Sequence, residues 1–221
     1  MGLLSERTIM VITEAFIPIV TAGIKFTIPL TILSFAIGLI IAIVVAVVQV
    51  ANIKVLNQIF KIYVWIFRGT PLLVQIFIIF FGLPKAGIMI EPFPASVIAF
   101  SLNVGAYSSE TIRGAILSVP QGQWEAGYAF GMTFPQVFRR IIMVQAAKVS
   151  VPPLFNSFIG LVKDTSLAAT VTLPEMFMIT QRYVAFRYEP LILYTEVAFI
   201  YLMLCSVLSV FQKQIEKKLK H

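Results

Sequence analysis

The sequence is poor in charge. Only 12% of its 221 residues are Asp, Glu, Lys or Arg, whereas 59% are hydrophobic. A soluble domain carries about twice that share of charged residues. A soluble globule of this length has too little interior to hide so much apolar surface. The composition therefore excludes a soluble enzyme, a disordered chain and a disulfide scaffold, and it leaves a membrane domain.

Histidine and cysteine are almost absent. The one histidine, His221, is the last residue, so neither His-based catalysis nor a His-cluster metal site is expected. The one cysteine, Cys205, cannot form an internal disulfide. The His-Glu-x-x-His and Gly-x-Ser-x-Gly patterns of hydrolases are missing as well. We therefore expect a protein that is not an enzyme and that holds no metal.

Five apolar stretches are long enough to cross a bilayer as helices, which takes about 20 residues each. Two of them carry breaks: Gly69-Thr70-Pro71 can bend or unwind the second, and Pro152-Pro153 should kink the fourth. The sequence predicts a single all-α membrane domain over residues 1–221. Its five transmembrane helices are expected at residues 26–48, 62–84, 93–112, 141–162 and 190–212.

The distribution of Lys and Arg predicts the orientation of these helices. With the C-terminus inside, the inner segments hold nine Lys and Arg in 50 residues, and the outer segments hold six in 60 with six acids. The inner segments are 49–61, 113–140 and 213–221, and the outer ones are 1–25, 85–92 and 163–189. Short loops rich in Lys and Arg stay in the cytoplasm. We expect a multi-pass protein of the cell (inner) membrane with its N-terminus outside and its C-terminus cytoplasmic. The net charge of +7 then belongs to the loops and predicts no nucleic-acid partner.

The longest inner segment is the most informative. Ser118 and Gln121 have the spacing of a capping box, which predicts the start of a helix. Gly127 and Gly131, four residues apart, would leave a bare stripe that another surface can approach closely. Large aromatic residues follow the predicted helix start, namely Trp124, Tyr128 and Phe130. The segment is either an interfacial helix on lipid headgroups or a docking element for a cytoplasmic partner.

This loop resembles the EAA loop of ABC importer permeases. The family pattern is Glu-Ala-Ala, three residues, Gly, nine residues, Ile, any residue, Leu-Pro. The matching positions here are Glu125, Ala126, Gly131 and Ile141. The departures are Gly127 for Ala, Met143 for Leu and Val144 for Pro.

Three further stretches resemble the polar amino acid subfamily of these permeases. They are Arg-Gly-Thr-Pro-Leu-Leu-Val-Gln at 68–75, the stretch 106–123, and Pro152-Pro153 followed by Lys-Asp-Thr-Ser-Leu at 163–167. The resemblance covers about residues 20–215 and implies the type I ABC importer permease fold. It also implies that the chain transports an amino acid by alternating access.

The resemblance implies three protein partners. A second permease subunit pairs with this one, as a homodimer or with a close paralogue, and an extracytoplasmic amino-acid-binding protein delivers the substrate. An ABC ATPase receives the loop as a coupling helix, through Glu125, Ala126, Gly127 and Gly131. Because this chain has no Gly-x-x-x-x-Gly-Lys-Ser/Thr phosphate loop, ATP and Mg²⁺ are expected on the ATPase, and this chain is expected to need no cofactor. An ATP-independent secondary carrier is the alternative, which the odd span number and the docking-like loop disfavour.

Polar residues inside the spans predict the substrate path, because they are costly against lipid. The expected substrate contacts are Thr70 and Leu72 (through the backbone), Gln75, Asn103, Ser109, Asn156, Asp164 and Thr165. Asn103 and Asn156 have the strongest case, since neither has an evident charge partner. The Asp164 carboxylate favours a basic amino acid (arginine, lysine or histidine), with glutamine or another polar amino acid as the alternative. Asp164 could equally pair with Lys163, and Ser109 could serve helix packing.

Three charged residues are expected near the inner boundary. Glu110 and Arg113 lie three residues apart on one helical face, which predicts an ion pair that is structural or part of a gate. Arg68 either joins that gate or extends towards the headgroups. Glu196 is the only charge of the last span, and one explanation is that it faces the interface between subunits.

Overall fold

The structure, a computed structural model, describes residues 6–219, and every regular element in that range is helical. The first half holds α1 (Glu6–Ala22), a π-helical turn (Gly23–Thr27), α2 (Ile28–Val50), α3 (Lys54–Gly69) and α4 (Leu72–Phe77). Two further turns, Ile78–Gly82 and Leu83–Ala86, extend α4. The second half holds α5 (Pro92–Leu117), α6 (Gln121–Ala129), α7 (Phe134–Val137), a π-helical turn (Phe138–Ile142), α8 (Met143–Asp164), a 3₁₀ turn (Thr165–Val171), α9 (Met176–Arg187) and α10 (Pro190–Leu219).

The first helix is longer than the sequence analysis predicts. Residues Glu6–Val50 form one continuous helix of 45 residues, so most of the expected outer segment 1–25 is helical as well. At 1.5 Å per residue this helix is about 68 Å long, roughly twice the thickness of a bilayer core. Pro18 and Lys25 do not end it. The continuous helix therefore starts well before the span predicted at 26–48.

The second predicted span is broken. Helices α3 and α4 meet at Thr70–Pro71, and the segments Lys54–Gly69 and Leu72–Ala86 are bent by 109°. The bend follows from proline chemistry, because Pro71 has no N–H to donate and forces the residue before it out of the helical region. Thr70 is accordingly extended, with φ −122° and ψ 147°.

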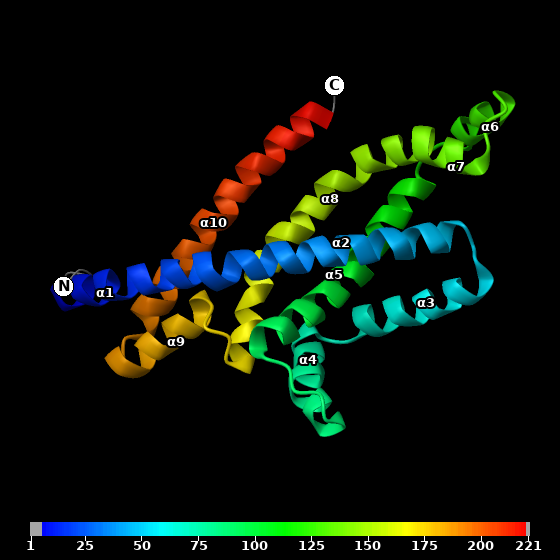
Figure 1. Cartoon of the computed structure of the whole chain (residues 1–221). Coiled ribbons are helices and arrows are strands. Elements are labelled where there is room, and N and C mark those ends of the chain that lie inside the picture. The colour runs from blue at the N-terminus through cyan, green and yellow to red at the C-terminus, as the bar shows by residue number, and fades with distance from the viewer. Residues whose placement is uncertain (1–5, 220–221) are drawn as a thin grey trace.

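The remaining predicted spans correspond to α5, α8 and α10. By length and composition, the described chain has two helices able to cross a membrane, Glu6–Val50 and Pro190–Leu219, and the bent pair makes a third. Helix α5 is more polar and is the most buried of the long helices, with 14 buried residues among its 26. Helix α8 continues through Pro152 and Pro153 and curves gradually rather than ending there (Figure 1).

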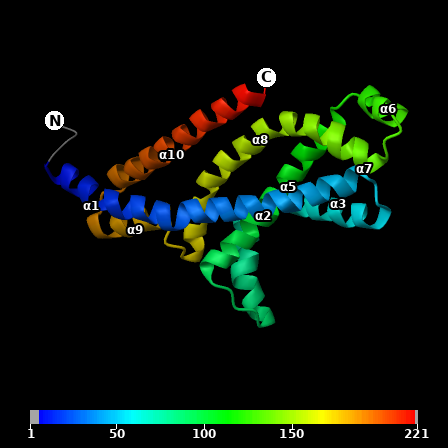
Figure 2. The ribbon, with the colours of Figure 1, turned by 45° about the horizontal axis from the view of Figure 1, so that its top comes forward.

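Helix α5 is the centre of the bundle and packs along α2 (Figures 1 and 2). Small residues on one face of α2 make this contact close: Ser34, Gly38, Ala42 and Ala46, each four residues from the next, are all buried. A Cβ on Gly38 would lie 2.7 Å from Val104 Cγ1 and 2.9 Å from the Ser101 carbonyl oxygen. Spacing of this kind allows helix backbones in membranes to approach one another.

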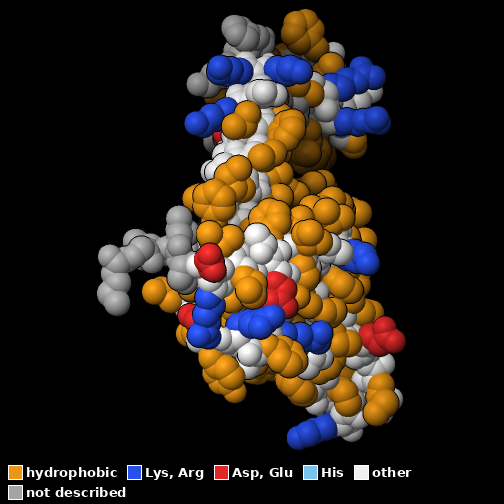
Figure 3. Space-filling view, turned by 90° about the vertical axis from the view of Figure 1, so that its left-hand side faces the viewer, with side chains coloured by type: hydrophobic (Ala, Val, Ile, Leu, Met, Phe, Trp, Pro, Cys, Tyr) orange, Lys and Arg blue, Asp and Glu red, His pale blue; other side chains and the backbone are white. Residues whose placement is uncertain are grey.

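The two ends of the molecule differ in charge. Helix α6 and the C-terminal end of α10 lie at one end, and α9 and the far end of α4 lie towards the other (Figures 1 and 2). Figure 3 shows Lys and Arg gathered at the end that carries the C-terminus, a largely hydrophobic middle, and mixed acidic and basic side chains lower down. This is the asymmetry that the loop composition predicts.

The close contact of α2 with α5 can be tested with one methyl group. Overpacking costs about 1–3 kcal/mol and replacing a helix glycine by alanine regains up to about 1 kcal/mol, so Gly38→Ala should lower the free energy of unfolding by about 1–2 kcal/mol. Gly114→Ala is the matched control, because a Cβ there meets nothing within 4 Å. Thermal unfolding of both purified variants in detergent measures the difference. Equal unfolding temperatures would show that α2 and α5 do not pack as described.

Candidate functional site

A cavity of about 390 Å³ lies where the α3–α4 break meets α5 and the end of α8. This volume is in the range of pockets for small ligands, about 300–1,000 Å³. Its lining includes Thr70, Pro71 and Leu72 at the break, and the polar residues Asn103, Tyr107, Ser108, Ser157 and Asp164. Four of the eight predicted substrate contacts thus line one cavity: Thr70, Leu72, Asn103 and Asp164.

Asp164 is the one carboxylate in the described lining of this cavity. Its side chain makes no ion pair or hydrogen bond within residues 6–219, so the alternative of a salt bridge with Lys163 is not realised. Lys163 instead lines a different cavity. The Asp164 carboxylate is therefore free to accept hydrogen bonds from a ligand.

Gln75 does not line the cavity, although it was expected to contact substrate. The side chain is 5% exposed. Its Nε2 donates to the Phe67 carbonyl at 2.9 Å, the Thr70 carbonyl at 3.0 Å and Thr70 Oγ1 at 2.9 Å. Its Oε1 accepts from Asn103 Nδ2 at 3.0 Å. Gln75 thus bonds to backbone groups that the broken helix leaves unpaired, and it links them to α5.

Three other expected contacts also lie outside the cavity. Asn156 Oδ1 accepts from Gln212 Nε2 at 2.9 Å. Ser109 and Thr165 are fully buried and donate to carbonyls of their own helical turns. On α8 the cavity takes residues 157, 160, 161 and 164, the i, i+3, i+4, i+7 face of a helix, and Asn156 lies at the edge of that face and pairs with Gln212 instead. The packing explanation holds for Ser109.

Tyr107 is a lining residue that the sequence analysis missed. It lies one helical turn after Asn103 on α5, so projecting the helix from Asn103 would have found it. Ser108 and Ser157 also line the cavity. Both are polar residues inside predicted spans, and the sequence leaves them open between the substrate path and helix packing, with packing favoured.

A charged cluster lies beside the cavity, towards α6. Arg113 binds Glu110 through two hydrogen bonds, from Nε at 3.1 Å and from Nη2 at 2.8 Å. Arg68 Nη1 lies 3.7 Å from Glu110 Oε2. The Arg68 guanidinium also sits over the Tyr107 ring, 5.5 Å from its centroid. The cluster ties the end of α3 to α5 next to a residue that lines the cavity.

Helix α6 projects from one end of the molecule and carries the EAA-like residues (Figure 1). Glu125 and Ala126 are exposed on it, and Phe130 just beyond it is 85% exposed. The predicted bare glycine stripe is not realised. Gly127 is buried, and a Cβ there would lie 2.7 Å from Val137 Cγ2. Gly131 has φ +73°, which the chain needs in order to turn after α6.

The predicted capping box at Ser118 is also absent. Ser118 Oγ donates to the Ala115 carbonyl, and Pro120 precedes the first residue of α6. A capping box occurs later, where Thr133 and Gln136 begin α7. Pro120 explains the start of α6 as well as a capping box would, since proline favours the first positions of a helix.

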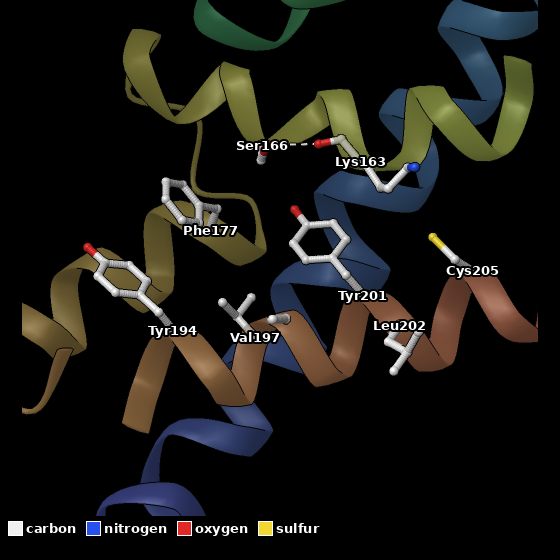
Figure 4. A pocket seen from close by; sticks show the side chains of 9 residues that line it. Lys163, Ser166, Phe177, Tyr194, Val197, Tyr201, Leu202 and Cys205 are labelled. Carbon is white, nitrogen blue, oxygen red and sulfur yellow. Dashed lines mark hydrogen bonds between the residues drawn. The ribbon is translucent and has the colours of Figure 1, made fainter. Parts of the chain in front are cut away.

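A second, larger cavity of about 660 Å³ lies between α9, α10 and the end of α8 (Figure 4). Its lining is mostly apolar and aromatic, and the Ser166 hydroxyl there donates to the Lys163 carbonyl. Beside it Tyr201 donates to Glu175, which also accepts from two backbone N–H groups at the start of α9. Burial raises the pKa of the Glu175 carboxyl. The sequence analysis counted Glu175 only as an outer acid.

Glu196 is buried within the described chain, at 9% exposure, and neither carboxylate oxygen has a hydrogen-bond partner there. It lies on the face of α10 that includes Leu193 and Val197, which belong to a buried cluster with α1. This burial contradicts the explanation that Glu196 faces a neighbouring subunit.

Comparison with known proteins places this geometry in a family. A profile described as "binding-protein-dependent transport system inner membrane component" matches residues 38–221. The L-cystine transport system permease protein TcyB of Bacillus subtilis (strain 168) is 50% identical over 209 residues, which cover 94% of this chain and 89% of that protein. The glutamine transport system permease protein GlnP of Escherichia coli (strain K12) is 34% identical over 206 residues, covering 92% of this chain and 94% of that protein.

A solved structure agrees with these relatives. The crystal structure of an amino acid ABC transporter with histidines superposes with a TM-score of 0.88 at 30% sequence identity, covering 93% of this chain and 96% of that chain. Permeases of this family work with a separate ATPase and a substrate-binding protein. The chain is therefore a membrane-spanning transport subunit rather than an enzyme, and it belongs to the inner-membrane permeases of binding-protein-dependent ABC importers, in the branch for amino acids.

Proposed function

We propose that this chain imports amino acids that carry a second ammonium or guanidinium group, with L-cystine first and the basic amino acids second. The cavity at the α3–α4 break is the proposed binding site. One observation carries this proposal: the free Asp164 carboxylate faces a cavity whose other polar groups are neutral amides and hydroxyls. A carboxylate in such surroundings favours a cationic partner.

Substrate chemistry distinguishes the candidates. Every amino acid brings one α-ammonium and one α-carboxylate. L-Cystine brings a second ammonium with a second carboxylate, arginine and lysine bring a second cationic group, and glutamine brings only a neutral amide. The 50% identity with an L-cystine permease supports cystine as the first candidate. The open backbone at Thr70 and Leu72 supplies groups for the substrate carboxylate, since irregular backbone in a membrane protein is tolerated where it lines a cavity.

The cluster of Arg68, Glu110 and Arg113 is proposed as the inner gate. It follows Asn103 by about two turns of α5 in the direction of α6, and it contacts the lining residue Tyr107. The Lys and Arg gathered at the end with the C-terminus support a cytoplasmic position for that end, and hence an N-terminus outside. A cluster on this side of the cavity would close the path until the subunits move.

The exposed face of α6 is proposed as the contact with the ATPase, which would bind ATP and Mg²⁺. Glu125 lies in a short helix whose start is positively polarised, and it can pair with a basic residue of that partner. A second permease subunit, either another copy or a close paralogue, would complete the pathway. An amino-acid-binding protein would deliver substrate at the opposite face.

Replacing Asp164 tests the substrate proposal. Asp164→Asn removes the charge and keeps the shape. A hydrogen bond to a charged group contributes about 1.5–3 kcal/mol, so affinity for L-cystine and L-arginine should fall by about 10–100-fold. Affinity for L-glutamine should change much less, because its side chain is neutral. Binding of the three labelled amino acids to the permease–ATPase complex in nanodiscs measures this selectivity.

Glu91→Gln is the matched control, because this exposed carboxylate precedes α5 and lies away from the cavity. It should leave all three affinities unchanged. An equal loss for all three amino acids in Asp164→Asn would contradict recognition of a second cationic group.

Reversing one charge on α6 tests the coupling role. Glu125→Lys should abolish or strongly reduce ATP-driven uptake into proteoliposomes, together with co-purification of the ATPase, and amino acid binding should persist. Glu216→Lys is the control, since it makes the same charge change near the C-terminal end of α10. Uptake reduced to the same extent in both variants would indicate a general effect of charge and not a docking contact.

A further inference from the structure

We infer that Gln75 sets the polarity of the binding site by orienting the Asn103 amide, so that the unpaired amide oxygen faces the substrate. This inference rests on the proposed function of the cavity and assigns its recognition of the α-ammonium group. Gln75 acts as a positioning residue, because it is buried and does not itself line the cavity.

The orientation begins at the broken helix. Pro71 and the bend leave the carbonyls of Phe67 and Thr70 without their usual helical donors. Carbonyl oxygens only accept hydrogen bonds, so the end of Gln75 that meets them must be its NH₂ group. The Nε2 atom lies 2.9 Å from the Phe67 oxygen and 3.0 Å from the Thr70 oxygen. Turning this amide around would bring the Gln75 oxygen against the carbonyl oxygens of Phe67 and Thr70, with no donor between them.

The orientation of the Gln75 amide then determines the orientation of the Asn103 side-chain amide. With Nε2 held at the bend, Oε1 points at α5 and requires a donor. Asn103 Nδ2 supplies it at 3.0 Å. This uses one N–H of the Asn103 amide and fixes its orientation, and its Oδ1 accepts no hydrogen bond within residues 6–219. Since Asn103 lines the cavity, that oxygen is the atom it offers to a ligand.

The consequence is a site that offers an amide oxygen and a carboxylate, with no Lys or Arg in its described lining. Asn103 Oδ1 comes from α5 and the Asp164 carboxylate comes from α8. Every amino acid has an α-ammonium, so the Asn103 oxygen suits the common group. Asp164 suits the second cationic group and so discriminates between substrates.

A simple electrostatic account makes the opposite prediction for one substitution. Asn103→Asp adds a negative charge to the cavity, so attraction alone predicts tighter binding of arginine. The orientation described here predicts weaker binding, because the new carboxylate would face the Gln75 oxygen and Gln75 cannot turn without losing its bonds to the carbonyls. The chain also contains a pair of opposite polarity: Asn156 accepts from Gln212, so Asn156→Asp keeps its bond.

Thermal unfolding of the permease–ATPase complex tests the orientation without any ligand. Asn103→Asp should lower the unfolding temperature by about 4 °C more in the wild-type background than in a Gln75→Met background. Residues in contact have a coupling free energy, and each kcal/mol of it shifts the unfolding temperature by only a few degrees in a chain of this size. Asn156→Asp should lower it far less than Asn103→Asp. Equal effects of Asn103→Asp in both backgrounds would overturn the inference.

Equilibrium binding of L-cystine, L-arginine and L-glutamine to the same complex tests the consequence. Gln75→Met should weaken all three by at least about 10-fold, the change expected from losing one well-placed hydrogen bond to a charged group. Gln212→Met, which breaks the other Gln–Asn pair, should change them less than about two-fold. Tighter arginine binding in Asn103→Asp, or equal binding in Gln75→Met and Gln212→Met, would overturn the inference. If wild-type complex bound none of the three while the unfolding difference held, the proposed substrates would fail and the orientation would stand.

Discussion

A membrane helix has no water with which to pair its backbone, and that constraint explains the centre of this molecule. Pro71 breaks the second span by 109° and frees carbonyl groups at Phe67 and Thr70. The Gln75 side chain supplies donors to these carbonyls, which allows the bend to exist inside the bundle. The bend in turn opens a cavity between α3–α4, α5 and α8. The proposed substrate site therefore depends on how one broken helix satisfies its hydrogen bonds.

Helix α5 combines tight packing with polar side chains. Its contact with α2 is close because α2 presents small residues every fourth position, such as Gly38 and Ala42. On the side facing α3, α4 and α8 it carries Asn103, Tyr107 and Glu110. A helix buried in this way can hold polar groups that would be costly against lipid. The same helix continues to Leu117 and leads, through Pro120, into α6, so one element connects the cavity to the proposed ATPase contact.

The two glycines of the EAA-like loop are present for a reason that differs from the one expected from the sequence. Gly127 and Gly131 match or replace small residues of the pattern, and the sequence suggested a surface made bare for a partner. In the structure Gly127 makes room for Val137 inside the chain, and Gly131 adopts a left-handed conformation that ends the helix. These two glycines shape the loop, and the exposed side chains of the segment include Glu125, Ala126 and Phe130.

Composition, the covalent chemistry of proline and a set of ordered motifs were enough to predict the membrane environment, the all-helical fold, the break at Pro71 and the family. Which polar residues meet could be seen only once the helices were packed together. Asn103 lines the cavity and Asn156 pairs with Gln212, Gln75 is buried, Asp164 makes no salt bridge with Lys163 in the described chain, and the first helix reaches back to Glu6. Composition determines how favourably a helix enters a membrane. The rotation of each helix about its axis, which decides where each side chain points, is determined by the helices packed against it.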